Sequence, residues 1–175
     1  MSNLNDFLAP VYKTQKTRTT KTLSGDINDG GTGVDPQQGG QEYFSQTVNN
    51  IKNNSVVIRG SLKMWYSHQG WLVVRIWRNT IPSGSDGSNS DPMSRADLVY
   101  EGWKYFPTGH MIGNDGGGTP YKEEDMNFTA IDSNTGGTSA TYKVCIGRTN
   151  TNSFEFQQTG TTIHFDTYDL FDLTA

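Results

Sequence analysis

Basic and aromatic side chains alternate with apolar ones along two neighbouring segments, residues 56–66 and 71–80. The set comprises Arg59, Lys63, Trp65, Trp71, Arg75 and Trp77. Where cations alternate with aromatic rings, the cations can bind phosphate and the rings can stack on nucleic-acid bases. Trp and Arg also supply most of the binding energy at subunit interfaces. A third interpretation is ordinary packing, with both faces of the segments buried and the Arg groups paired with acids. The residue types leave all three interpretations open.

The common catalytic signatures are absent from the sequence. It contains no Gly-x-x-x-x-Gly-Lys-Ser/Thr phosphate loop, no Gly-x-Ser-x-Gly elbow and no His-Glu-x-x-His metal helix. The Gly-rich stretch 113–118 is not followed by Lys and Ser/Thr at the required spacing, so it predicts a loop. We therefore expect no catalytic residues, no cofactor and no enzyme activity.

Metal-ligating residue types are few and scattered. His68, His110 and His164 lie far apart in the sequence and suggest no site. The single cysteine, Cys145, lies in an apolar strand-like run and is expected to pack as a small apolar residue. One cysteine also excludes an internal disulfide framework and a Cys-based zinc site. We expect no metal site built from these residues.

Acidic residues gather at 123–125 and in a loop that holds Asp86, Asn89 and Asp91. Calcium takes several oxygen ligands from flexible loops, so an ion at a subunit junction is one alternative. Neither cluster has the Asp-x-Asp-x-Asp-Gly spacing of a calcium loop. We therefore expect both clusters to be solvated turns.

The first segment of the chain is basic although the whole chain carries a formal charge of -4. Within residues 1–21, Asp6 opposes four cations, Lys13, Lys16, Arg18 and Lys21. This asymmetry makes the four cations candidate nucleic-acid contacts, with a solvated tail as the alternative.

The same segment carries apolar residues at the spacing of one helical face, although Pro10 would cut such a helix short. They are Leu4, Phe7, Leu8, Val11 and Tyr12. So short a helix is marginal alone, and its apolar face predicts docking on a partner. Residues 23–41 contain six glycines, which predicts a flexible or extended linker. We therefore predict an extended N-terminal arm and Gly-rich linker over residues 1–41.

Residues 42–175 predict an all-β domain. Strand signals occupy Tyr43–Ile51, Ser55–Tyr66, Trp71–Thr80, Leu98–Tyr105, Met126–Asp132, Thr141–Gly147, Ser153–Gln157 and Thr161–Asp169. About eight antiparallel strands without a long helix favour a single jelly-roll sandwich. No apolar stretch has the length of a membrane span, and residues 1–6 do not resemble a signal peptide.

Four short segments resemble strands of small single-jelly-roll coat proteins, those of satellite-necrosis-type and circular single-stranded-DNA viruses. The segments are Val56–Leu62, Trp71–Asn79, Asn127–Asp132 and Phe165–Leu170. The resemblance implies a capsid subunit of the virion that assembles an icosahedral shell with copies of itself, made in the host cell without a signal peptide. It also implies a basic N-terminal arm that faces the genome, a role that only Lys13, Lys16, Arg18 and Lys21 match.

The chain departs from these coat proteins in its sparsely basic arm and its pI of about 5.2. Binding to nucleic acid scales with the number of phosphates neutralised, so four cations predict a weak genome contact. This departure favours an alternative, a phage capsid cement, decoration or fibre-like protein that binds another capsid lattice. A glycan- or receptor-binding β-sandwich domain is a further alternative.

Overall fold

Eleven β-strands and no helix make up the part of the chain that the computed structural model describes, residues 12–29, 35–67, 69–107, 113–114, 120–149 and 154–172. No helix in these ranges is long and apolar enough to cross a membrane. The strands are β1 (Tyr12–Thr22), β2 (Ile27–Asp29), β3 (Gln41–Asn49), β4 (Val56–Ser67), β5 (Gly70–Arg78), β6 (Leu98–Phe106), β7 (Gly113–Asn114), β8 (Pro120–Asp132), β9 (Ser139–Arg148), β10 (Phe154–Phe156) and β11 (Thr162–Asp172). Each of the eight predicted segments overlaps one of these strands.

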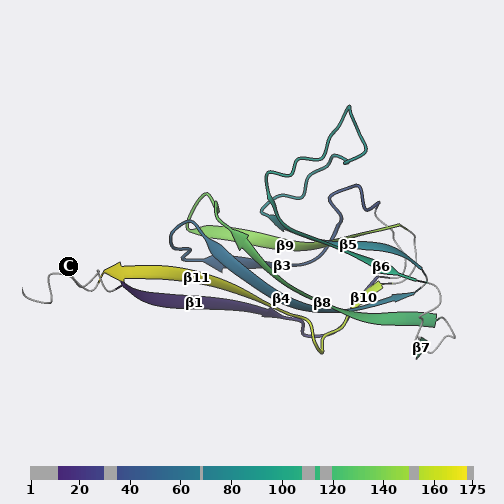
Figure 1. Cartoon of the computed structure of the whole chain (residues 1–175), viewed down its shortest axis with the longest axis horizontal. Coiled ribbons are helices and arrows are strands. Elements are labelled where there is room, and N and C mark those ends of the chain that lie inside the picture. Colours follow the sequence, from purple (N-terminus) through teal and green to yellow (C-terminus); the bar gives the residue numbers. More distant parts are fainter. Residues whose placement is uncertain are drawn as a thin grey trace, which may run out of the picture.

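The strands form two antiparallel sheets that pack face to face (Figure 1). The larger sheet has the order β1-β11-β4-β8, with β10 and β2 continuing along the edge of β4 and β7 beside β8. The smaller sheet has the order β3-β9-β5-β6. Successive main strands thus pass between sheets in the order of a jelly roll, which confirms the predicted fold class.

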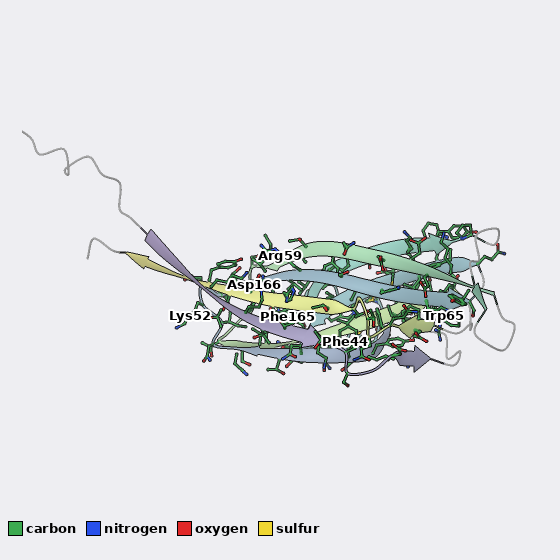
Figure 2. The ribbon with its side chains drawn as sticks, turned by 90° about the horizontal axis from the view of Figure 1, so that it is seen from below. Phe44, Lys52, Arg59, Trp65, Phe165 and Asp166 are labelled. Atoms are coloured by element: carbon green, nitrogen blue, oxygen red, sulfur yellow. The ribbon has the colours of Figure 1, made fainter. Side chains whose placement is uncertain are left out.

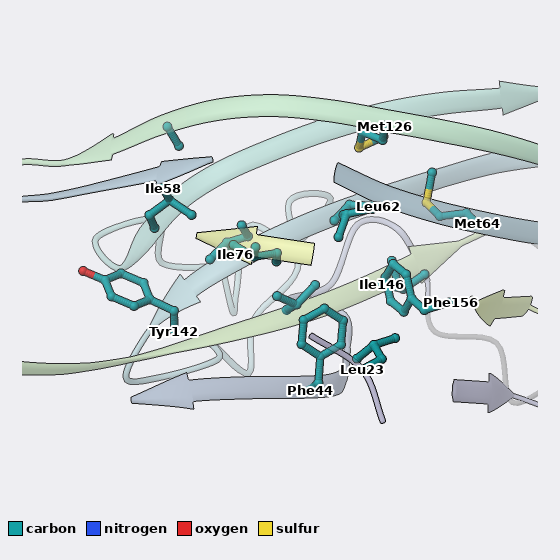
Figure 3. Close-up of a cluster of buried hydrophobic side chains, with 14 of the residues drawn as sticks. Leu23, Phe44, Ile58, Leu62, Met64, Ile76, Met126, Tyr142, Ile146 and Phe156 are labelled. Carbon is teal, nitrogen blue, oxygen red and sulfur yellow. The ribbon is translucent and has the colours of Figure 1, made fainter. Parts of the chain in front are cut away.

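The core lies between the two sheets, where alternate side chains of each strand meet (Figure 3). Ile58, Leu62 and Met64 of β4 point inward, as the alternation predicts, and Ile76 of β5 faces them. The Tyr142 ring of β9 stacks on Phe165 with 5.2 Å between ring centroids. The period-two pattern therefore identified the inward faces of β4 and β5 correctly.

The predicted division at residue 41 is wrong for the described part of the arm. Tyr12–Thr22 is β1, a main strand of the jelly roll, and it pairs with β11 along its whole length. Leu23 is buried in the core. Over Lys16–Thr22 the side chains of β1 are exposed or half-buried, so few apolar residues are needed there, and its Thr residues suit an extended strand. The eight main strands thus include β1, which was not predicted, and exclude the short β10, which was.

Two strands continue beyond the body of the sandwich as a ribbon. β11 pairs with β4 only over Thr162–Asp166, whereas it pairs with β1 from Thr162 to Asp172. The β1–β11 ribbon therefore projects from one end of the molecule, with Tyr12 at its tip (Figure 1). Asn53 donates a hydrogen bond of 2.8 Å from Nδ2 to the Tyr168 carbonyl and ties the ribbon to the β3–β4 turn.

The outer face of the smaller sheet is partly covered by two loops. The long connection between β5 and β6, residues 79–97, rises above this sheet (Figure 1). Residues 35–40 lie against the same face, with Pro36 and Gly39 buried. This part of the predicted linker is therefore packed, because Arg75 of β5 donates hydrogen bonds to its backbone carbonyls.

Candidate interaction surfaces

Three cations surround one buried carboxylate on the outer face of the larger sheet. Asp166 of β11 is fully buried, and its oxygens lie 3.2 Å from Lys16 Nζ, 2.6 Å from Arg18 Nε and 2.6 Å from Arg59 Nη1. These cations come from β1 and β4, the two neighbours of β11, and each is more than a third exposed. Figure 2 shows Arg59 and Asp166 together near the base of the ribbon. We call these four residues the Asp166 cluster.

The Asp166 cluster stabilises the ionised carboxylate. The hydrogen bonds from Arg18 lower the pKa of Asp166 to about 2, with a further contribution from Lys16, although burial opposes this shift. The same hydrogen bond raises the pKa of the Arg18 guanidinium. Because three cations share one carboxylate, the cluster keeps a net positive charge at neutral pH.

The four predicted nucleic-acid contacts, Lys13, Lys16, Arg18 and Lys21, all lie on β1. Lys16 and Arg18 are engaged by Asp166, and Lys21 is partly exposed. Lys13 lies on β1 opposite Phe171 in the register. Of the predicted docking residues, Leu4, Phe7, Leu8 and Val11 lie outside the described residues, and Tyr12 begins β1.

The predicted interface residues do not form one surface, because β4 and β5 belong to different sheets. Their order along the chain suggested neighbouring strands of one sheet. Arg59 and Lys63 lie on the outer face of the larger sheet, with Trp65 nearly buried beside Tyr121. The other three residues lie on the outer face of the smaller sheet, on the opposite side of the molecule.

Arg75 is fully buried and holds the covering loops in place. Its guanidinium donates to Glu101 Oε2 at 2.6 Å and to the carbonyls of Gln38 and Pro36 at 2.6 and 2.7 Å. Trp77, also fully buried, donates from Nε1 to the Gly39 carbonyl at 2.7 Å. The prediction of a subunit interface is therefore wrong for Arg75 and Trp77, and the packing interpretation applies to them.

A small second core lies beneath the same loops. Trp77, Met93 and Cys145 are buried together there, with Ile81 and Leu98 against them. Burial raises the pKa of the Cys145 thiol to about 12. This confirms the prediction that Cys145 packs as a small apolar residue.

Each acidic cluster forms ion pairs with cations of the same chain. Asp86 pairs with Arg95 at 2.6 Å, and Glu124 pairs with Lys104 at 2.9 Å. Across the described ranges, no three His, Cys, Asp or Glu side chains are grouped so that they could hold a metal ion. His164 contacts Thr20, whereas His68 and His110 lie outside those ranges.

An exposed aromatic cluster occupies the uncovered end of the smaller sheet. Trp71 of β5 is 46% exposed, and Trp103 and Tyr105 of β6 are each 45% exposed. Trp71 lies opposite Tyr105 in the strand register. The prediction from the sequence included Trp71 but not Trp103 or Tyr105. Their signal was the period-two spacing of Trp103 and Tyr105 within a strand.

Comparison with known proteins gives partial structural likenesses only. No family model matches the sequence, and no curated protein matches it. A structure of the Gt strain of infectious bursal disease virus shares 14% identity at a TM-score of 0.47, covering 88% of this chain and 33% of that one. A mutant VP2 protein of the same virus, in derived particles, shares 13% identity at a TM-score of 0.40, covering 91% and 40%.

A carbohydrate-binding module described as CBM4 shares 13% identity at a TM-score of 0.37, covering 96% of this chain and 82% of that one. Of the first viral structure, that of the Gt strain, this chain spans about a third of the length. At these identities and TM-scores, none of the three likenesses transfers a function to this chain.

Proposed function

We propose that this protein is a non-catalytic structural subunit of a virus particle, a coat subunit that assembles an icosahedral shell with copies of itself. The observation that carries the proposal is the β1–β11 ribbon that projects from a jelly roll. A fold alone does not specify a function. The ribbon supports the proposal because it presents a strand edge beyond the sandwich, where another subunit can reach it.

Charge adds a second support for contact between copies. An exposed strand edge invites indiscriminate pairing unless charged side chains block it. Lys16 and Arg18 lie on the edge strand β1, whereas the whole chain carries a formal charge of -4. The edge strand β1, which holds four cations and no acid, is therefore complementary to the acidic body of a neighbouring copy.

The segment before β1 extends this contact. Tyr12, the first residue of β1, pairs with Asp172 at the ribbon tip, and residues 1–11 precede it in the sequence. We propose that the apolar residues of this segment, Leu4, Phe7, Leu8 and Val11, dock on a neighbouring subunit. Burial of each large apolar side chain would contribute about 1.5–3 kcal/mol.

A second candidate function is that of a cement or decoration protein on another capsid lattice. The Asp166 cluster favours it, because Lys16 and Arg18 already share a carboxylate of their own chain. Few cations of the N-terminal segment then remain to neutralise genome phosphates, so the genome contact is weak.

The test is the mass of the purified full-length protein by multi-angle light scattering, with the absorbance ratio at 260 and 280 nm. We expect megadalton particles. A nucleic-acid-free monomer or trimer would overturn the coat role and support the decoration role. Deletion of residues 1–11 should leave β1 and the fold intact but prevent assembly. Deletion of residues 1–3, which keeps the apolar residues, is the matched control.

A further inference from the structure

The aromatic cluster of Trp71, Trp103 and Tyr105 presents large ring surfaces to solvent in a fixed arrangement. The Trp71 ring lies 5.1 Å from Tyr105 and 6.2 Å from Trp103, measured between centroids. The ring planes of these two pairs are inclined by 48° and 76°. The rings therefore form angled walls rather than one flat surface.

Polar groups of the chain hold Trp103 in place. Its Nε1 donates to Glu101 Oε1 at 3.0 Å, and the Arg75 guanidinium lies 5.7 Å from its ring centroid. Arg75 is itself fixed by the carbonyls of Pro36 and Gln38. Since the indole N–H already donates to Glu101, Trp103 can contact a ligand through the face of its ring but not as a hydrogen-bond donor. A ligand that stacks there meets a preorganised surface, so little side-chain entropy is lost on binding.

A shallow hollow of about 570 Å³ adjoins these rings, lined by Pro36, Gln37, Trp71, Trp103 and Thr149. Its volume falls in the range of about 300–1,000 Å³ typical of small-molecule sites. Apolar rings and Pro36 make most of the wall, and the Gln37 amide and Thr149 hydroxyl add polar groups. This combination of stacking surface and few hydrogen-bonding groups is that of a ligand site.

Charge selects among the ligands that could stack there. None of the five lining residues is charged. Arg75, beside Trp103, and Arg95 both pair with Glu101 and Asp86. A nucleic acid would bring phosphates for which no lining cation is provided. The site therefore suits an uncharged ligand with an apolar face and hydroxyl groups.

We propose that Trp71, Trp103 and Tyr105 form a binding site for a neutral glycan. The C–H bonds on one face of a pyranose ring carry partial positive charge and meet the negative face of an aromatic ring. The sugar hydroxyls at the rim would bond to Gln37 and Thr149. This binding is independent of the structural role proposed above, and it would give a particle built from the chain a way to attach to glycans.

The test titrates the full-length protein with four neutral hexasaccharides, built of β-1,4-glucose, β-1,3-glucose, mannose and N-acetylglucosamine, while intrinsic tryptophan fluorescence is followed. We expect at least one to bind, with affinity reduced at least tenfold by Trp71→Ala or Trp103→Ala. Trp71→Phe should retain part of the affinity. Ile131→Ala, at an exposed apolar residue of β8, should leave it unchanged.

Absence of binding by all four sugars, or binding that survives both alanine variants, would overturn the proposal. A single-stranded (dT)20 probe tests nucleic acid, and binding there that Trp71→Ala abolishes would reassign the cluster. Loss of particle mass in Trp71→Ala without sugar binding would assign it to contacts between copies. Urea unfolding of each variant checks that the substitutions, all at exposed positions, leave the fold intact.

Discussion

Arg18 on β1 and Asp166 on β11 are joined by two hydrogen bonds, 2.6 Å from Nε to Oδ1 and 2.9 Å from Nη2 to Oδ2. The two residues lie directly opposite each other in the strand register. Such two-point contacts are the stronger and more directional kind of ion pair. This pair fastens β1, an edge strand with few apolar contacts, to the rest of the sheet.

Asp166→Asn should lower the free energy of unfolding by about 2–3 kcal/mol at neutral pH, as expected when a carboxylate with a pKa near 2 loses its charge. The cations it leaves are partly exposed and can be solvated, which limits the loss. Urea unfolding measures the change. Asp125→Asn, at an exposed position of β8, is the matched control and should change it by less than about 0.5 kcal/mol.

The stabilisation by Asp166 should disappear in acid. Its pKa is about 2 in the folded protein and near 3.8 when unperturbed. A lowered folded-state pKa means that the contribution is complete above about pH 4 and is lost as the pH falls toward 2. The stability difference between wild type and Asp166→Asn should therefore be constant from pH 7 to 5 and shrink below pH 4. A difference that persists at pH 2 would contradict this account.

Arg75→Ala should destabilise the fold by about 3–5 kcal/mol, because it leaves Glu101 and the carbonyls of Pro36 and Gln38 without their buried partner. Arg95→Ala is the control, since Arg95 pairs with the same Glu101 and Asp86 but its side chain is 44% exposed. Exposed ion pairs contribute about 0–1 kcal/mol. Equal losses in chemical denaturation would show that burial of Arg75 does not matter.

The Cys145 thiol should not react with a water-soluble disulfide reagent in the folded protein at pH 8. It is buried and its pKa is about 12, so almost no thiolate is present. In 6 M guanidinium one thiol per chain should react within minutes. The release of the coloured thiolate product measures both rates, and rapid reaction of the native protein would contradict the burial of Cys145.

Removal of residues 1–22 should unfold the domain or lower its unfolding midpoint sharply, whereas removal of residues 1–11 should not. The longer deletion removes β1 and exposes the backbone edge of β11 and the core around Leu23. Circular dichroism during thermal unfolding compares the two. A stable domain after the longer deletion would restore the arm-plus-domain division at residue 41.

Strand positions could be predicted from the sequence where apolar residues alternate, as at Val56, Ile58 and Leu62. β1 could not, because a strand of Lys and Thr buries little, and its partner lies 140 residues or more along the chain. The assignment of β4 and β5 to opposite sheets could not be predicted from the sequence either. Alternation around a glycine is the same for a hairpin and for a connection that crosses between sheets.

The surfaces were harder to predict than the fold. Alternation placed Arg75 and Trp77 correctly on the face turned away from the main core. Whether that face is buried depends on loops 35–40 and 79–97, whose conformation is set by the hydrogen bonds of Arg75 and Trp77 themselves. Trp71 lies beyond these loops, and so only this aromatic residue of β5 stayed exposed.

The pairing of β1 with β11 has a consequence for the order of events on the ribosome. At about 5–20 residues per second, synthesis of the intervening residues takes roughly 7–30 s. During that time β1 has been made but its partner has not, so the larger sheet cannot close. Contacts this distant along the chain also form slowly. A strand of Lys, Arg and Thr, KTQKTRTTKT, remains hydrated during the wait, where an apolar strand would aggregate.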